Sequence, residues 1–314
     1  MKSISKWLIL AGACSYGVLS TFVVFAYDRG FTVDEVVGGQ NFAGFLLMAA
    51  AYLVSRLLAG RTRSGARPGI FAGLSRGTPL AARDGLKLAG VGALMASTGI
   101  FYYGALQSLP ASFAIVLLFQ FSWIGVLVDA LLSRKLPSAI EGLAILVLFA
   151  GTLLAGGVLP GGFGGADLAG ILLGLASAVT YALFILFSSR VAPQGAPLGR
   201  SLIMSAGSLL VSFIVYPPSF LANGALGQGL LLWALLLALF GAVIPTLFFA
   251  IGAPGTGGSL ASILSAAELP TAVLMSALVL GETVTWLKWV GVLVILGGIA
   301  LPEWSKLRDR RQGA

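Results

Sequence analysis

Long apolar segments follow one another along the whole chain, separated by short stretches rich in charged residues, proline and glycine. A membrane-spanning helix needs about 20 mainly apolar residues, and ten segments reach or approach that length. They lie near Trp7–Tyr27, Val36–Leu58, Leu86–Leu106, Ala111–Leu132, Ser138–Val158, Leu168–Ser189, Ser201–Phe220, Leu230–Ile251, Ser259–Leu280 and Trp286–Leu301. The pattern therefore predicts an all-α integral membrane protein with ten transmembrane helices.

The basic residues predict how these helices are oriented, because Lys and Arg concentrate in cytoplasmic loops. With the N-terminus inside, ten spans place 17 of the 19 Lys and Arg residues on the cytoplasmic side and only Arg29 and Lys288 outside. A count that is wrong by one would destroy this partition. We therefore expect both termini in the cytoplasm and the protein in the cytoplasmic (inner) membrane.

Composition excludes most other classes of protein. Only 10% of the 314 residues are charged and 58% are hydrophobic, whereas a soluble domain has about 25% charged residues. The absence of histidine and the single cysteine, Cys14, remove the commonest metal ligands, so no metal or cofactor is expected. An integral membrane enzyme would need clustered His, Asp or Glu at a membrane face, and this chain is not expected to be an enzyme.

The net charge of +8 is explained by the membrane-flanking loops. Basic residues dispersed at the ends of spans meet anionic lipid headgroups, so membrane lipids are expected partners. Nucleic acid is not, because no basic patch on a recognisable nucleic-acid module is present.

A weak internal repeat divides the chain into two halves. An offset of 147 residues superimposes Phe101 on Phe248 and Ala114 on Ala261, and a slightly different offset places Tyr16 on Tyr181. Each half, residues 1–160 and 161–314, then holds five spans, and an odd number turns the second half upside down relative to the first. We expect two inverted five-helix repeats that form one integrated membrane domain, a plan common among secondary transporters.

Two stretches carry a resemblance to a known family. They are Glu268-Leu269-Pro270 followed by an apolar run to Gly281-Glu282 and a final helix with Gly291 and Gly297-Gly298, and the turn Ala105–Ser112 in the first half. With ten spans in two halves, the chain resembles the EamA-type family of the drug/metabolite transporter (DMT) superfamily. It departs from the family pattern at Arg134-Lys135, where Gly-Glu is common, and at Gln40-Asn41, where a basic residue is often found.

The resemblance implies a secondary transporter that exports small metabolites, amino acids or related compounds, from a bacterial cytoplasm by alternating access. Proton-coupled uptake is one alternative function, and a flippase for lipids or lipid-linked substrates is another. A small-molecule substrate is the expected partner, and both a monomer and a homodimer are compatible with the sequence.

Glu268 is the strongest candidate for a functional residue. It lies near the middle of the ninth predicted span, where a charged carboxylate costs roughly 2.5–3.5 kcal/mol and therefore faces a cavity or a partner. Protons are the candidate coupling ion at this carboxylate; the alternative is a structural role in fixing the bundle. Pro270 beside it, and Pro245 in the eighth span, are candidate kinks because proline frees a backbone carbonyl one turn back.

Other intramembrane polar and aromatic side chains form a second candidate set, whose members bind either substrate or neighbouring helices. They are Gln120, Trp123, Tyr102, Tyr103, Tyr16, Tyr181 and Asn41. Tyr16 and Tyr181 occupy matching repeat positions and could flank a central cavity. Asp129, near Arg134 and Lys135, lies at a predicted helix end, where a structural role is expected because water is within reach.

Overall fold

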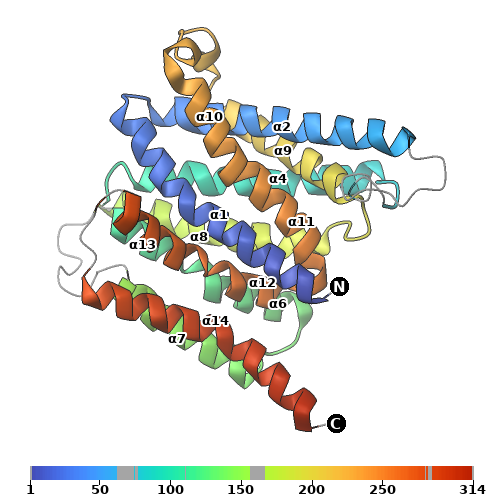
Figure 1. Ribbon diagram of the computed structural model, residues 1–314, viewed down its shortest axis with the longest axis vertical. Coiled ribbons are helices and arrows are strands. Elements are labelled where there is room, and N and C mark those ends of the chain that lie inside the picture. Colours follow the sequence, from blue (N-terminus) through green and yellow to red (C-terminus); the bar gives the residue numbers. More distant parts are fainter. Residues whose placement is uncertain are drawn as a thin grey trace.

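A computed structural model of the chain describes residues 2–61, 74, 77–109, 111–155, 167–279, 281 and 285–312. These residues form a bundle of helices that run parallel and antiparallel to one another (Figure 1). The α-helices are α1 (Lys2–Asp28), α2 (Val33–Arg61), α4 (Ala82–Ala105), α5 (Ala111–Leu118), α6 (Phe121–Ser133), α7 (Ala139–Ala155), α8 (Leu168–Arg190), α9 (Pro197–Val215), α10 (Leu231–Ala238), α11 (Ile244–Thr256), α12 (Gly258–Ser265), α13 (Glu268–Val279) and α14 (Trp286–Gln312). A 3₁₀ turn, η1 (Ser219–Leu221), and two π-helical turns, η2 (Leu226–Leu230) and η3 (Leu239–Val243), complete the described elements.

Eight helical segments among the described residues are long and apolar enough to cross a membrane. The fifth and tenth predicted spans correspond to two shorter apolar helices, Ala139–Ala155 and Trp286–Leu301. Large apolar side chains such as Leu131, Leu278 and Leu293 are exposed on the outer surface, as expected where lipid tails replace water. The protein is therefore a multi-pass membrane protein.

Short polar motifs fix where several helices begin. At the start of α7 the backbone N–H of Ser138 donates to Glu141, and the N–H of Glu141 donates to the Ser138 hydroxyl, which is a complete capping box. Asp167 precedes α8 and accepts from the N–H groups of Ala169 and Gly170. Hydrogen bonds from the Ser108 hydroxyl and from these two backbone groups hold the pKa of Asp167 below its usual range.

The fourth and ninth predicted spans are each divided into two helices by a short break. The first break lies at Phe119 and Gln120, between α5 and α6, and the second at Ala266 and Ala267, between α12 and α13. Pro270 explains the second break, because its ring clashes with the carbonyl four residues earlier and it has no N–H to donate. The two breaks are separated by the same 147 residues that relate the matching sequences of the two halves.

The helices of the two halves pack against each other in matching pairs. Helix α1 packs against α12 and α13, and α8 packs against α5 and α6. The α1–α11 contact has a counterpart in the α8–α4 contact, and the α2–α10 contact has one in the α9–α4 contact. Helices α7 and α14 pack against each other at one edge of the bundle (Figure 1).

One side of the bundle, at which α1 begins and α14 ends (Figure 1), is held closed by basic residues, and we call it the terminus side. Arg200 in α9 is completely buried and donates to the carbonyls of Ala250 in α11, at 2.5 Å, and of Ser188 in α8. Arg190 at the end of α8 forms an ion pair with Asp129 in α6 at 2.5 Å.

One expectation about a charged residue is corrected here. Arg200 is not a solvated flanking residue, because its buried guanidinium donates to the carbonyls of Ser188, near the end of α8, and of Ala250, within α11. Asp129, for which a structural role was expected, forms an ion pair with Arg190 of α8. Glu282 lies outside the described residues.

Candidate functional site

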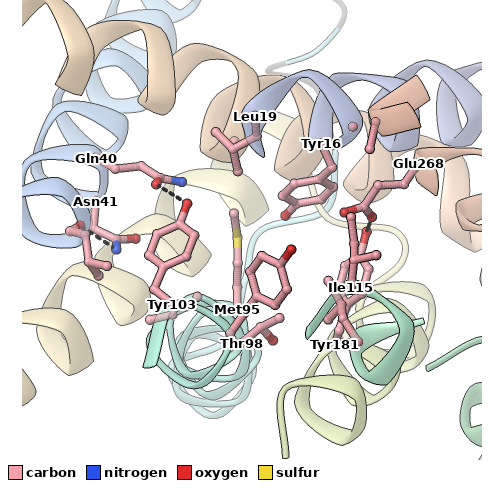
Figure 2. A pocket seen from close by; sticks show the side chains of 18 residues that line it. Tyr16, Leu19, Gln40, Asn41, Met95, Thr98, Tyr103, Ile115, Tyr181 and Glu268 are labelled. Carbon is pink, nitrogen blue, oxygen red and sulfur yellow. Dashed lines mark hydrogen bonds between the residues drawn. The ribbon is translucent and has the colours of Figure 1, made fainter. Parts of the chain in front are cut away.

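A cavity lies between the helices of the two halves, and residues of both halves line it. Its wall is formed by Tyr16, Gly17, Leu19, Val37, Gln40, Asn41, Met95, Ala96, Thr98, Gly99, Tyr102, Tyr103, Ile115, Leu118, Tyr181, Gly241, Glu268 and Ala272. Figure 2 shows two polar groups of side chains at opposite ends of the cavity, with Leu19, Met95 and Thr98 between them. We call these ends the carboxylate pole (Tyr16, Tyr181, Glu268) and the amide pole (Gln40, Asn41, Tyr103).

The helix break places Glu268 at the carboxylate pole. Glu268 is the first residue of α13, so its carboxylate lies at the end of the helix where the helix dipole favours negative charge. The side chain is buried, and its Oε2 accepts a hydrogen bond of 3.2 Å from the Tyr181 hydroxyl. Within the described part of the chain it has no ion-pair partner, because the ion pairs found there are Lys87–Asp84 and Arg190–Asp129.

Aromatic rings surround the carboxylate. Tyr16 and Tyr181 meet edge to face with ring centroids 5.5 Å apart, and the ring centroids of Tyr181 and Phe121 are 4.6 Å apart. Tyr102 and Tyr103 follow along the cavity wall with centroids 6.0 Å apart. The structure therefore brings Tyr16 and Tyr181, from matching positions of the two halves, into direct contact beside Glu268.

Hydrogen bonds hold the side chains of the amide pole. The Tyr103 hydroxyl donates to Gln40 Oε1 at 3.3 Å, and the Ser208 hydroxyl donates to Asn41 Oδ1 at 2.7 Å. Asn41 Nδ2 donates to the carbonyl of Val37 at 3.0 Å. Gln40 is not among the sequence-predicted site residues, although an amide well inside an apolar helix is the feature that could have identified it.

Gln120 and Trp123 lie outside this cavity. The backbone N–H of Gln120 bonds to Leu117, so the break leaves the Val116 carbonyl without its usual helical donor, and the Gln120 Nε2 donates to it at 2.7 Å. Trp123 Nε1 in turn donates to Gln120 Oε1 at 2.8 Å, and its ring lines a separate apolar hollow beside α7. These two side chains therefore serve the helix break rather than the cavity.

Pro270 and Pro245 lie at two backbone irregularities next to the cavity. In η3 the N–H of Ile244 bonds to Leu239, so the next carbonyl, that of Phe240, would need a donor from Pro245, which has none. The Ser15 hydroxyl of α1 replaces the missing donor with a hydrogen bond of 2.6 Å to the Phe240 carbonyl oxygen. The hinge role of both prolines stays a prediction.

Comparisons with known proteins agree with this architecture. The model of the EamA-like transporter family matches residues 168–302. A crystal structure described only as that of a protein shares the fold, with a TM-score of 0.68 and 20% sequence identity over 99% of each chain. No curated protein matches the sequence.

The family match confirms the resemblance that the motifs around Glu268 and Gly291 indicate. The EamA-like family belongs to the DMT superfamily and consists of transporters rather than enzymes. Residues 168–302 of this chain are thus similar to the EamA-like transporter family.

Proposed function

We propose that this protein is a secondary transporter that exports small metabolites across the cytoplasmic membrane by alternating access to the cavity described above. The observation that carries the proposal is a cavity between the two halves of the chain that holds one buried carboxylate, Glu268, with no ion-pair partner among the described residues. Buried intramembrane carboxylates of this kind mark substrate and proton pathways. Glu268 is the proposed coupling residue, with protons as the coupling ion.

The proposed architecture is ten spans in two inverted repeats, residues 1–160 and 161–314. The matched positions of the two helix breaks and the matched packing pairs of the two halves support it. Helices α7 and α14 supply the two spans beyond the eight long ones, because a membrane-spanning helix has about 17–25 residues and α7 has 17. The Lys and Arg distribution supports termini in the cytoplasm.

Alternating access requires the terminus side to open. In this structure the Arg200 hydrogen bonds to α8 and α11 and the Arg190–Asp129 ion pair hold that side together. The cavity wall instead includes residues near the opposite ends of α2 and α4, such as Val37 and Tyr103. The proposed cycle separates these terminus-side contacts while the opposite side closes, so that the cavity faces each side in turn. Tyr16, Tyr102, Tyr103, Tyr181 and Asn41 are the proposed substrate contacts.

Transport by the full chain in liposomes tests the proposal. Counterflow of radiolabelled amino acids, nucleosides and sugars is measured with and without a pH gradient, and at least one solute is expected to exchange and to be driven by the gradient. Glu268→Gln is expected to lower the gradient-driven rate at least tenfold, because a neutral amide can no longer exchange a proton. Glu141→Gln, at the exposed start of α7, is the matched control and is expected to transport normally.

Three results would contradict the proposal. Translocation of a labelled lipid without flux of any solute would identify a flippase. Solute accumulation together with protons, rather than in exchange for them, would identify proton-coupled uptake. An unchanged dependence on the pH gradient in Glu268→Gln would remove the coupling role of this carboxylate.

A further inference from the structure

The charge of the cavity wall restricts which solutes it can hold. The 18 residues that line it include one carboxylate, Glu268, and neither Lys nor Arg. An anionic solute would therefore meet a negative charge and no cationic side chain, in a site where poor screening strengthens both attraction and repulsion. A cationic solute would instead find its counter-ion in place.

The carboxylate also has an unused acceptor. Tyr181 donates to Oε2 of Glu268, and Oε1 receives no hydrogen bond from the described residues. Buried charged groups are stable when they are paired and hydrogen-bonded, so a donor from the ligand would complete this group. The rings of Tyr16, Tyr102 and Tyr181 line the cavity around it, and aromatic faces attract cations at short range.

The amide pole offers a different kind of contact. The oxygens of Gln40 and Asn41 already accept from Tyr103 and Ser208, whereas Gln40 Nε2 donates to no group in the described ranges. This pole therefore presents a neutral donor, which suits a carbonyl, hydroxyl or ether oxygen. Between the poles, Leu19, Met95 and Ile115 offer apolar surface.

From these contacts we infer that the cavity selects solutes with a protonated amine attached to an apolar or aromatic body, and that it discriminates against the corresponding carboxylates. The ammonium group binds Glu268 at the carboxylate pole, and an acceptor on the body reaches Gln40. An α-amino acid is a poorer ligand than its amide or decarboxylated amine, because its carboxylate lies beside the ammonium and within the field of Glu268. This inference names the substrate class of the proposed transport site and rests on that proposal only for the movement of the solute.

Direct binding to the purified full chain in detergent tests the inference with four compounds that share one phenyl body. They are β-phenethylamine, phenylalaninamide, phenylalanine and 3-phenylpropionate. The two amines are expected to bind at least tenfold more tightly than phenylalanine, and 3-phenylpropionate is expected not to compete. Equal or tighter binding of phenylalanine or 3-phenylpropionate would overturn the inference.

Variants assign the preference to the carboxylate. Glu268→Gln is expected to weaken binding of both amines at least tenfold and to reduce the difference between their affinity and that of phenylalanine. Glu141→Gln is expected to leave the amine affinities and this difference unchanged. Glu268→Asp keeps the charge and is expected to keep the preference for amines; this variant covers the case in which Glu268→Gln fails to fold. Loss of the preference in Glu268→Asp, or its retention in folded Glu268→Gln, would remove Glu268 from the site.

Failure of this inference is distinguishable from failure of the proposed function. If amines bind but neither a labelled amine nor any other labelled solute crosses the liposome membrane, the specificity stands and transport is wrong. If labelled metabolites cross but amines neither bind nor compete, transport stands and the specificity is wrong.

Discussion

Gln120 and Glu268 lie at the two matching helix breaks, yet their side chains serve different purposes. The Gln120 side chain donates a hydrogen bond to the Val116 carbonyl of its own segment, whereas Glu268 keeps one carboxylate oxygen available to the cavity. Both residues stand out in the sequence as polar groups in apolar segments, so the pattern predicts that each needs a partner. The pattern could not predict which of the two side chains faces the cavity. The Gln120 side chain is held by the Val116 carbonyl, which is freed by a helix break that no proline in the sequence indicates.

Replacing Gln120 tests this structural role. Gln120→Leu is expected to lower the free energy of unfolding by about 1–3 kcal/mol, because the Val116 carbonyl and the Trp123 N–H lose their partners. Thermal unfolding in detergent measures the change, with Gln107→Leu on the exposed turn after α4 as the control of the same residue type. Ligand affinity of the folded variant is expected to be unchanged; a large loss of affinity at unchanged stability would instead place Gln120 on the substrate path.

At the scale of elements, the cavity depends on how closely α1 approaches the broken helix. A Cβ atom built on Gly17 would lie 2.5 Å from the backbone oxygen of Glu268, so only glycine permits the observed contact. The sequence predicts the kink near Pro270 from the chemistry of proline. It does not reveal the packing of Gly17, because close approach depends on which helix lies opposite, and many other glycines in the chain have ample room.

Two Gly→Ala substitutions separate close packing from helix propensity. Gly17→Ala is expected to destabilise the protein by about 1–3 kcal/mol, because backbone atoms of α13 must move, and to weaken ligand binding by displacing Glu268. Gly90→Ala in α4, where a Cβ would meet nothing within 4 Å, is expected to be neutral or to stabilise by about 0.5–1 kcal/mol, because alanine favours helix. Thermal unfolding and binding assays check both, and equal behaviour of the two variants would contradict this account of Gly17.

At the scale of the whole molecule, the hydrophobic pattern predicts the positions of the helices well because a bilayer imposes length and composition on every span. Each of the ten predicted segments coincides with described helices, although two of these helices are short and two spans are broken. The burial of Arg200 could not be predicted, because a basic residue close to a predicted span end is usually a solvated flank. Only the folded arrangement shows that carbonyls of α8 and α11 enclose it.

Cysteine labelling in intact cells tests the proposed orientation. In a Cys14→Ser background, Ala222→Cys on the exposed segment between α9 and α10 is expected to react with a membrane-impermeant maleimide. Leu136→Cys on the turn between α6 and α7, where the side chain is 94% exposed, is expected to react only after the cells are permeabilised. The reverse result would place the termini outside, and labelling of both positions in intact cells would contradict the proposed number of spans.

The contact between Tyr16 and Tyr181 has a further consequence for the proposed cycle. If these tyrosines are equivalent, the approximate twofold axis of the proposed inverted repeat passes between them. The 147-residue offset then pairs Glu268 with Phe121. In a perfectly symmetric protein, the two halves would exchange conformations between the inward-open and outward-open states, and the two states would be equal in free energy. Because a carboxylate stands where the other half has a phenyl ring, the two states differ in free energy. A proton or solute that binds Glu268 more tightly in one state therefore shifts the population toward that state.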